Sequence, residues 1–537
     1  MIDLSDIVKA YDVRGLVGEQ LTTEVARALG AAFVTVTGAR QLVAGRDMRE
    51  SGPQLLAAFA EGAAGQGADV IDIGLASTDL LYFASGHLDL PGAMFTASHN
   101  PARYNGIKLC RAGAQPIGAD TGLVEIRTIA QGYLADGLPA AVDIPGTVSR
   151  QDLLVDYARY LRGLVDLSGG RPLTVVVDAG NGMAGYTVPA VLGDAELAAL
   201  PLRIVPLYFE LDGSFPNHEA NPLDPANLVD LQRAVVAERA DLGLAFDGDA
   251  DRCFVVDADG APVSPSAVTG LVAVRELVKA PGSAVIHNLI TSRAVPEIIS
   301  EHGGRPIRTR VGHSYIKAEM ASTEAVFGGE HSAHYYFRDF WRADTGMLAA
   351  MHVLAALGEQ PGTLAALCAD YERYVASGEI NSTVADQAGR VAAVRAEFAE
   401  QTTDTDTLDG LTLQLADGAW LNVRASNTEP LLRLNVEAGS AERMAEVRDR
   451  ALAVIRSEEA VKMSVSADLL AILACPSPDH APLRLESNPA TGAEELVCNH
   501  CASRFPIRDG IPVLLADEAV PGPNGLGNPA DRPEPTG

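Results

Sequence analysis

Three segments of the chain repeat one pattern: a short apolar run, a polar loop and a second apolar run. The polar loops are Thr96–Pro101, Asp247–Arg252 and Gly328–His334. An apolar run followed by a helical pattern precedes each loop, and these runs begin at Val43, Leu173 and Ala284. Strands that alternate with helices form parallel βα units, whose ligands bind beyond the carboxyl ends of the strands. The repeat therefore predicts three similar α/β domains that each deliver one polar loop.

The pattern changes after Ser377. Helical patterns at 385–400 and 442–457 enclose short strands with turn signals, which is typical of an α+β domain. A small separate module follows, and the end of the chain is rich in Pro, Gly, Asn and Asp, as disordered segments are. The predicted domains are 1–151, 152–257 and 258–376 for the three α/β repeats, 377–460 for the α+β domain, 466–517 for the module and 518–537 for a disordered tail.

Composition narrows the class of protein. A chain of 537 residues with 47% hydrophobic and 21% charged residues is globular, and no apolar run is long enough to span a bilayer. The net charge of −29 argues against nucleic acid as a partner. The first residues include Asp3 and Asp6 where a signal peptide has basic residues, so we expect a cytoplasmic protein, either monomer or dimer. Six thinly spread cysteines argue against a disulfide framework.

Asp247, Asp249 and Asp251 alternate along the second polar loop. After a strand, this spacing can turn three carboxylates toward one hard divalent cation, and the other interpretation is a solvated acidic turn. An EF-hand is excluded, because its sixth and twelfth positions need Gly and Glu where this chain has Arg252 and Ala258. A haloacid-dehalogenase phosphatase also uses paired aspartates after a strand, but it does not explain the seryl loop and the phosphate clamp described next.

Ser98 lies in the first polar loop, where a lone serine is usually an ordinary turn residue. The aspartate loop indicates instead that Ser98 carries a phosphoryl group, because charge neutralisation by a metal assists phosphoryl transfer. The planar guanidinium of Arg252 suits the transferring group. A serine hydroxyl is a poor nucleophile without a base. The candidate bases are Lys108, if its pKa is depressed, and His99.

Other loops carry polar side chains that suit the rest of a sugar phosphate. Glu330 and Ser332 suit sugar hydroxyls. His313 and His334 are either site residues or ordinary core or surface histidines. Guanidinium groups, hydroxyls and an amide form a predicted anion cradle at Arg424, Ser426, Asn427, Thr428 and Arg433.

Four loops in order resemble the signature loops of the α-D-phosphohexomutases, and most of all those of the bacterial phosphomannomutase/phosphoglucomutase branch. They are Thr96–Pro101, Asp247–Arg252, Gly329–His334 and Arg424–Pro430. The resemblance covers about residues 7–457. It implies a four-domain enzyme that interconverts hexose 1-phosphate and hexose 6-phosphate. In such an enzyme phosphorylated Ser98 gives its phosphoryl group to the substrate, and a hexose 1,6-bisphosphate forms, reorients and returns its other phosphate.

The resemblance also implies roles for individual residues. Mg²⁺ would be held by an oxygen of phosphorylated Ser98 and by Asp247, Asp249 and Asp251. Further residues near the reaction centre or the substrate would be Tyr11, Arg14, His99, Lys108 and His313. Two departures from the family pattern concern the third repeat. His287-Asn288 stands where a lysine is common. The sugar loop has His331 where Met, Tyr or Gln is common and Ala333 where Gly is common.

We therefore expect a phosphomannomutase that interconverts mannose 1-phosphate and mannose 6-phosphate and feeds GDP-mannose supply. Glucose phosphates are expected as further substrates, and a hexose 1,6-bisphosphate as activator. The alternatives are a phosphoglucosamine mutase, and a mutase-derived scaffold whose C-terminal module binds a partner protein.

The C-terminal module resembles the small Trm112-like zinc-ribbon family at Leu470–Pro476 and Phe505–Leu515. Related modules bind methyltransferases, which implies a protein partner. Cys498 and Cys501 form one metal-binding knuckle, whereas the other has only one cysteine. We expect either a zinc site, with Cys475 and with His480 or Asp479 as further ligands, or a metal-free remnant held by its apolar strands.

Overall fold

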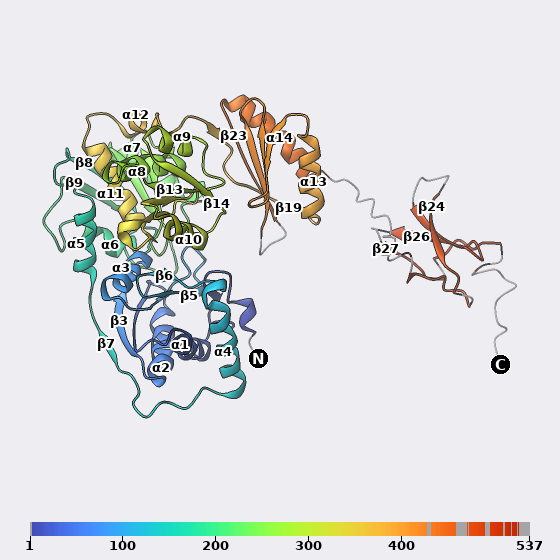
Figure 1. Cartoon of the computed structure of the whole chain (residues 1–537), viewed down its shortest axis with the longest axis horizontal. Coiled ribbons are helices and arrows are strands. Elements are labelled where there is room, and N and C mark those ends of the chain that lie inside the picture. Colours follow the sequence, from blue (N-terminus) through green and yellow to red (C-terminus); the bar gives the residue numbers. More distant parts are fainter. Residues whose placement is uncertain are drawn as a thin grey trace. The chain divides into compact units, whose positions relative to one another are not determined.

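A computed structural model of the chain describes residues 3–426, 431–457, 470, 472–478, 480–488, 494–508, 511–516, 518–523 and 525 (Figure 1). The chain divides into two compact units, Met1–Ala451 and Leu452–Gly537. In the described residues, no helix is both long and apolar enough to cross a membrane.

The first sheet has the order β1-β5-β4-β2-β3-β7, and β6 pairs with β5. Its strands are β1 (Val13–Leu16), β2 (Gln41–Arg46), β3 (Asp69–Leu75), β4 (Gly92–Phe95), β5 (Tyr104–Arg111), β6 (Gln115–Pro116) and β7 (Val148–Arg150). Its helices are α1 (Thr23–Thr37), α2 (Gly52–Gly65), α3 (Thr78–Leu88) and α4 (Leu123–Asp136). Thr22 and Ser77 cap α1 and α3 through their side-chain oxygens, as hydroxyl residues commonly do.

The second sheet has the order β12-β11-β10-β8-β9. Its strands are β8 (Leu173–Asp178), β9 (Leu202–Leu207), β10 (Leu242–Phe246), β11 (Cys253–Asp257) and β12 (Pro262–Val263). Its helices are α5 (Leu154–Leu164), α6 (Ala184–Val191) and α7 (Val229–Glu238).

The third sheet has the order β14-β13-β15-β16-β17. Its strands are β13 (Ala284–Asn288), β14 (Arg305–Thr309), β15 (Phe327–Gly329), β16 (Tyr335–Phe337) and β17 (Ala343–Asp344). The helices of this part are α8 (Pro265–Lys279), α9 (Ala294–Glu301), α10 (His313–Thr323), α11 (Gly346–Gly358) and α12 (Leu364–Cys368).

Each of these three sheets contains one hairpin that carries a predicted polar loop. The strands β4, β10 and β15 pair in parallel with β2, β8 and β13 on one side. On the other side they pair with the antiparallel strands β5, β11 and β16, which leave the loops. The predicted repeat of three α/β domains is confirmed.

The three α/β domains share one hydrophobic core, which the sequence pattern did not predict. The cluster includes Val43 and Met94 from the first sheet, Val175 and Phe246 from the second, and Leu354 from α11. Residues Gly346–Leu357 of α11 are all buried, because this apolar helix is surrounded by protein. A shared core fixes the three loop-bearing hairpins relative to one another.

The fourth sheet is antiparallel, with the order β18-β23-β22-β21-β20 and β19 paired with β23. Its elements are β18 (Val375–Ala376), β19 (Ile380–Thr383), α13 (Gln387–Glu397), β20 (Thr402–Asp406), β21 (Leu411–Leu415), β22 (Trp420–Ala425), β23 (Leu431–Ala438) and α14 (Ala441–Ile455). The predicted α+β domain is confirmed.

The C-terminal unit contains a small antiparallel sheet with the order β24-β25-β26-β27. Its strands are β24 (Leu483–Ser487), β25 (Glu494–Cys498), β26 (Arg504–Arg508) and β27 (Ile511–Pro512). Val520 pairs with Arg504 through two backbone hydrogen bonds of 2.8 and 2.9 Å, so ordered structure extends into the segment predicted as a disordered tail. The rest of that tail, 526–537, lies outside the described residues.

Candidate active site

Ser98 lies in the loop between β4 and β5 and is 2% exposed. Its backbone has a φ of 49°, in the left-handed region that residues with a Cβ rarely adopt. The Ser98 hydroxyl donates to Asp247 Oδ2 at 2.8 Å, and its oxygen lies 3.1 Å from His99 Nδ1. The first polar loop therefore presents its serine directly to the aspartate loop of the second domain.

The three aspartates of the second loop are fully or almost fully buried and converge. Asp247, Asp249 and Asp251 each offer a carboxylate oxygen within 4.8 Å of the other two. Within the described residues, Asp249 Oδ1 and Asp251 Oδ1 are buried and have no hydrogen-bond partner. Buried carboxylate oxygens without donors fit a hard divalent cation with oxygen ligands.

Two cationic side chains enter the same cluster. Lys108, on β5, donates to Asp249 Oδ2 at 2.7 Å and to Asp251 Oδ2 at 2.6 Å. Arg252 Nε lies 3.3 Å from Asp247 Oδ2, and its Nη2 donates to His99 Nδ1 at 2.7 Å. The predicted residues Ser98, His99, Lys108 and Arg252 thus meet at the aspartate loop.

The electrostatics of the two candidate bases differ. Burial disfavours the Lys108 ammonium, but the carboxylates of Asp249 and Asp251 outweigh this cost and raise its pKa well above the ordinary value. The charges of the protein alone therefore favour the Lys108 ammonium, and the identity of the base at Ser98 stays a prediction. Burial and the nearby Arg252 charge lower the pKa of His99 well below its usual value, which keeps this imidazole neutral at pH 7.

Thr78 is a site residue that sequence reasoning missed. Its hydroxyl donates to Asp249 Oδ2 at 2.6 Å and its backbone N–H donates to Asp249 O at 2.9 Å. It follows β3 and opens α3, next to the capping residue Ser77. A polar pair at the carboxyl end of a parallel strand is a recognisable signal. Its partner in the aspartate loop, however, lies 171 residues away in sequence.

The next residue, Asp79, is also buried beside the site. It accepts hydrogen bonds from the side-chain hydroxyls of Ser77, Tyr157 on α5 and Thr345 at the start of α11. Burial raises the pKa of Asp79 to about 6, in spite of these three donors. Asp79 thus connects the three α/β domains through these three hydroxyl donors, none of which is cationic.

The third polar loop meets the second. His334 Nε2 lies 3.7 Å from Asp251 Oδ1, and the backbones of Arg252 and His334 form a β-bridge. Ser332 Oγ lies 3.1 Å from His334 Nδ1. Glu330 is buried and accepts from Tyr336 OH at 2.7 Å and from Gly312 N–H at 3.2 Å. Sugar hydroxyls would therefore compete with protein donors for the Glu330 carboxylate.

The N-terminal motif also reaches the serine loop. Arg14, on β1, donates to Asn100 Oδ1 at 2.5 Å and to Asp12 Oδ2 at 2.6 Å. The ring of Tyr11 packs edge-on against Tyr315 of α10, with centroids 6.5 Å apart. His313 is the first residue of α10. The three residues implied by resemblance therefore lie on segments that are linked to the polar loops.

The cradle of the fourth domain is occupied by a carboxylate of the same domain. Arg424 Nη2 donates to Glu379 Oε2 at 2.6 Å, and Arg433 Nη1 lies 3.5 Å from Glu379 Oε1. Both arginines keep a buried Nε–H without a hydrogen-bond partner among the described residues, which suits a further anion. Ser426 follows β22, whereas Asn427 and Thr428 lie outside the described residues.

His287 does not replace the charge of the lysine that is common at this position. It is buried on β13, and burial lowers its pKa to about 4, so the ring is neutral at pH 7. The buried Lys317 of α10 is likewise engaged, because its Nζ lies 2.7 Å from Asp344 Oδ1 and 4.2 Å from the centre of the Tyr82 ring. Neither side chain supplies an open cationic contact.

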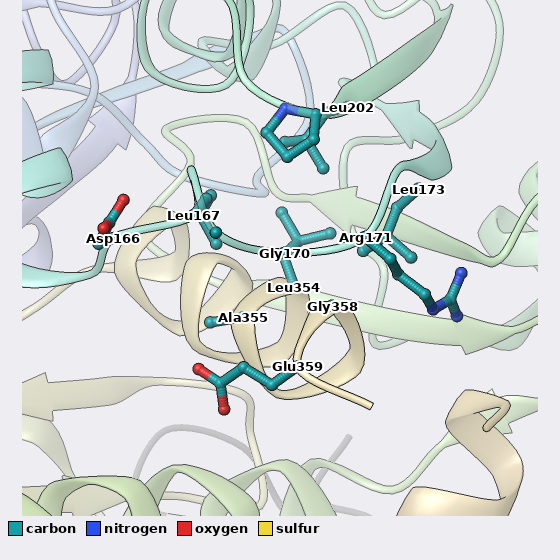
Figure 2. Close-up of a pocket in the computed structure, with 12 residues that line it drawn as sticks. Asp166, Leu167, Gly170, Arg171, Leu173, Leu202, Leu354, Ala355, Gly358 and Glu359 are labelled. Atoms are coloured by element: carbon teal, nitrogen blue, oxygen red, sulfur yellow. The ribbon is translucent and has the colours of Figure 1, made fainter. Parts of the chain in front are cut away.

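A cavity of about 330 Å³ lies apart from these loops (Figure 2). It is lined by residues 166–167, 169–171, 173 and 201–202 and by residues 354–355 and 358–359 at and just after the end of α11. None of the four signature loops contributes to it. Its arginine, Arg171, already donates to Asp241 Oδ1 at 2.8 Å and to Gln360 O at 3.1 Å. The cavity therefore offers no free guanidinium to a sugar phosphate.

The C-terminal unit holds a separate cluster of three buried thiols. Cys475, Cys498 and Cys501 bring their sulfur atoms within 4.8 Å of one another. Cys498 Sγ accepts from the backbone N–H groups of His500 and Cys501 at 3.4 and 3.3 Å, an arrangement that suits a thiolate. His480 Nδ1 lies 3.3 Å from Cys475 O, so this nitrogen faces a backbone oxygen. Asp479 lies outside the described residues.

Comparison with known families agrees with this geometry along the chain. The phosphoglucomutase/phosphomannomutase family matches with its α/β/α domain I at residues 5–134, domain II at 156–260, domain III at 265–374 and its C-terminal domain at 379–454. Residues 466–510 match the Trm112p-like protein family.

Individual relatives extend the match over most of the chain. A phosphomannomutase of Salmonella typhimurium is 38% identical over 84% of this chain and 98% of its own length. Phosphohexose mutases of Xanthomonas campestris are 41% identical over 82% of this chain and 96% of their own length.

Solved structures give the same result for the fold. The crystal structure of a Burkholderia thailandensis phosphoglucomutase/phosphomannomutase family protein aligns with a TM-score of 0.75 and 33% identity, covering 85% of this chain and 99% of that one. An Aspergillus fumigatus N-acetylphosphoglucosamine mutase, solved with GlcNAc-6P and magnesium, shares the fold at 14% identity and a TM-score of 0.55, covering 84% of this chain and 96% of that one. With its four domains matched in order, the chain belongs to the phosphoglucomutase/phosphomannomutase family of phosphohexose mutases, which are intramolecular phosphotransferases.

Proposed function

We propose that this enzyme interconverts mannose 1-phosphate and mannose 6-phosphate through a phosphorylated Ser98 and a hexose 1,6-bisphosphate, and that it also accepts glucose phosphates. The observation that carries the proposal is the hydrogen bond from the Ser98 hydroxyl to Asp247, within a buried cluster that also holds Lys108 and Arg252. The names of the relatives favour mannose as the first substrate.

The charges of the cluster support a magnesium ion. Three carboxylates and the two cations Lys108 and Arg252 leave one net negative charge, which a divalent cation would turn positive. Asp247, Asp249 and Asp251 would hold the ion together with a phosphoserine oxygen. When bound, Mg²⁺ withdraws charge from the phosphoryl oxygens. The magnesium of the Aspergillus relative belongs to a protein of the same fold.

Side chains of the protein would bind the phosphoryl group and accept the serine proton. Arg252 lies beside Asp247 and His99 and would bind the transferring phosphoryl group through its planar fork. His99 Nδ1 is within reach of the Ser98 hydroxyl, and we assign it the serine proton in preference to Lys108, which two carboxylates hold as an ammonium. Arg252 Nη2 also donates to His99 Nδ1. If the Arg252 guanidinium turned to bind the phosphoryl group, the lone pair of His99 Nδ1 would become free to accept the serine proton.

Substrate recognition would fall to the other loops. Glu330 and Ser332 would bind sugar hydroxyls, and His334 lies between them and the aspartate loop. The second phosphate would enter the cradle of Arg424, Ser426, Asn427, Thr428 and Arg433 in the fourth domain. Tyr11, Arg14 and His313 would complete the substrate site from the segments that adjoin the serine loop and α10.

A coupled assay tests this function. The enzyme is supplied with mannose 1-phosphate or glucose 1-phosphate, Mg²⁺ and a catalytic amount of hexose 1,6-bisphosphate, and the ratio of rates sets the preference. Turnover of either sugar that disappears in Ser98→Ala is the expected result. Turnover of glucosamine phosphate alone would favour a phosphoglucosamine mutase. A biological role that survives Ser98→Ala would favour a scaffold whose C-terminal module binds a partner protein.

For the C-terminal module we propose a zinc site on Cys475, Cys498 and Cys501, with the fourth position open to His480, Asp479 or an outside ligand. The three convergent sulfurs and the N–H donors to Cys498 support it. Elemental analysis should find about one zinc per chain, lost in Cys498→Ser and kept in Cys368→Ser, which alters a buried cysteine outside the module. A wild-type chain without zinc would leave the metal-free module as the better description.

A further inference from the structure

Arg49 is a buried arginine whose role the function above does not explain. It follows β2 and is 2% exposed. A guanidinium has five N–H donors, and each of them finds an acceptor here. Nε donates to Asp47 Oδ2 at 3.2 Å. The other four donors bond to backbone carbonyls of the serine loop: Ser98 at 2.9 Å, Asn100 at 2.6 Å, Pro101 at 3.0 Å and Tyr104 at 2.9 Å.

The second domain covers the same guanidinium. The ring of Phe215 lies 5.2 Å from the Arg49 guanidinium carbon, as in a cation–π contact. Gly213 packs so closely that a Cβ there would lie 2.8 Å from Arg49 Cα. Within the described part of the chain, the only carboxylate bonded to the guanidinium is Asp47, which is itself fully buried. Buried ion pairs contribute little net stability, so this arrangement points to a role in geometry.

The loop that Arg49 holds is under backbone strain. Ser98 has a left-handed φ of 49°, which is unfavourable for a residue with a Cβ. Its carbonyl is fixed from two sides, because Arg49 donates to it and Gly248 of the aspartate loop packs against it. A Cβ on Gly248 would lie 2.5 Å from this oxygen. The direction of the Ser98 hydroxyl therefore depends on the peptide that Arg49 holds.

We propose that Arg49 is a positioning residue for phosphoryl transfer, because its guanidinium holds the strained serine loop in the conformation that directs Ser98 Oγ at Asp247. Among the described residues, no hydrogen bond joins Arg49 to the Ser98 hydroxyl or to the aspartate loop, and it acts through four backbone carbonyls. The proposal rests on Ser98 as the phosphoryl carrier. A lysine at this position would keep the charge but could not present five donors in one plane.

The test compares Arg49→Lys with Arg162→Lys. Arg162 is a matched control, since its guanidinium also donates to three backbone carbonyls, those of Val191, Gly193 and Ala198, outside the polar loops. For each variant we would measure kcat, KM, Tm and the rate at which hexose 1,6-bisphosphate phosphorylates Ser98, by intact mass. We expect Arg49→Lys to lower kcat and the phosphorylation rate about 100-fold with KM within about threefold, as for a misplaced reacting group.

Three outcomes would count against the proposal or its basis. If Arg49→Lys and Arg162→Lys lose kcat in the same proportion to their loss of Tm, Arg49 is merely structural. If wild-type enzyme shows no Ser98-dependent turnover, the proposed function fails first and takes this inference with it. If Arg49→Lys does not fold, Arg49→Gln replaces it: this neutral side chain offers two N–H donors where Arg49 has five, should lower kcat several-fold at unchanged KM, and overturns the proposal if kcat stays at the wild-type value.

Discussion

The reaction centre and the phosphate cradle are both charged sites, but they are held in different ways. At the reaction centre, Lys108 is 17% exposed and the aspartates it binds are 2% exposed or less, with partners from two domains. In the cradle, Arg424 and Arg433 are 11% and 30% exposed and share one carboxylate, Glu379, of their own domain. The first site is held by buried contacts between two domains, whereas the second, as the proposed phosphate cradle, holds a carboxylate that a substrate phosphate would replace.

This difference has a physical basis in what each site must do. Phosphoryl transfer gains from groups that are already in place when charge develops, so a rigid buried cluster suits it. In the proposed mechanism a bisphosphorylated sugar binds, reorients and binds again, which favours weaker and exchangeable contacts in the cradle. Variants at both sites can test this contrast, from the largest expected effect to the smallest.

The largest effect is expected for Asp249→Asn. This change removes one charge from the cluster and one ligand of the proposed ion, while it keeps the shape of the side chain. We expect kcat to fall by more than about 100-fold, with a higher Mg²⁺ concentration needed for half-maximal activity. A magnesium titration measures both. The control is Asp241→Asn, which alters the partner of Arg171 beside the separate cavity and should leave both values near wild type. If Asp249→Asn kept its activity, the contrast between the reaction centre and the phosphate cradle would fail.

Asp79 sharpens the contrast, because it is a buried acid near the reaction centre whose side-chain donors in the described residues are all hydroxyl groups. Its pKa is raised from 3.8 to about 6, so the folded state binds this proton more tightly than the unfolded state. The corresponding stability is complete below about pH 4 and is lost as pH rises through 6, and it amounts to about 3 kcal/mol.

Urea unfolding of wild type and Asp79→Asn between pH 4 and 7 measures this contribution. The free energy of unfolding of wild type should fall relative to that of the variant by about 2.4 kcal/mol over this range, since the unfolded carboxyl is already partly ionised at pH 4. Carboxylates that titrate in both proteins cancel in the difference. Parallel pH profiles would show that Asp79 is ionised in the folded protein at pH 4 already.

Thr78→Val should have a smaller effect on the same ligand. The substitution removes the hydroxyl that donates to Asp249 Oδ2 but keeps the backbone N–H that donates to Asp249 O. We expect the Mg²⁺ concentration for half-maximal activity to rise about tenfold, as for other outer groups that orient a metal ligand. Thr128→Val, at an exposed helical site, is the control. An unchanged magnesium requirement would mean that Lys108 alone orients Asp249.

The smallest effect is expected in the cradle. Glu379→Gln removes the resident counter-charge, so KM for the hexose phosphate should fall about two- to fivefold with kcat nearly constant, in line with a partly exposed ion pair. Glu301→Gln breaks an exposed pair with Arg373 and should change neither value. A higher KM in Glu379→Gln would instead mean that Glu379 orients the two arginines for binding.

Local patterns were enough for much of this protein. Alternating apolar runs and turn residues, which act over a few positions, predict the three hairpins and the α+β domain. They also give the order of the polar loops along the chain. The same holds for the three aspartates, because their spacing brings the carboxylates together within one short loop. Ser98 and Lys108 could be named as well, since both lie in or beside the hairpin whose loop breaks the apolar pattern.

The remaining site residues were missed for a common reason. Thr78, Asp79, Arg49 and Glu379 look like ordinary cap, loop and strand-end residues in the sequence. Their partners lie far along the chain: Thr78 and Asp249 are 171 residues apart, Asp79 and Thr345 266, and Arg49 and Ser98 49. The periodicity of apolar residues over a few positions cannot show which residues so far apart in the sequence will be in contact.

The sequence by itself therefore determined which chemical groups the enzyme has and which loops carry them. Only the tertiary structure decided their state, because burial and neighbouring charges act through space. It holds Lys108 as an ammonium between two carboxylates, keeps His99 and His287 neutral, and raises the pKa of Asp79 to about 6. The shared core of three domains sets these distances, and with them the charge on each group.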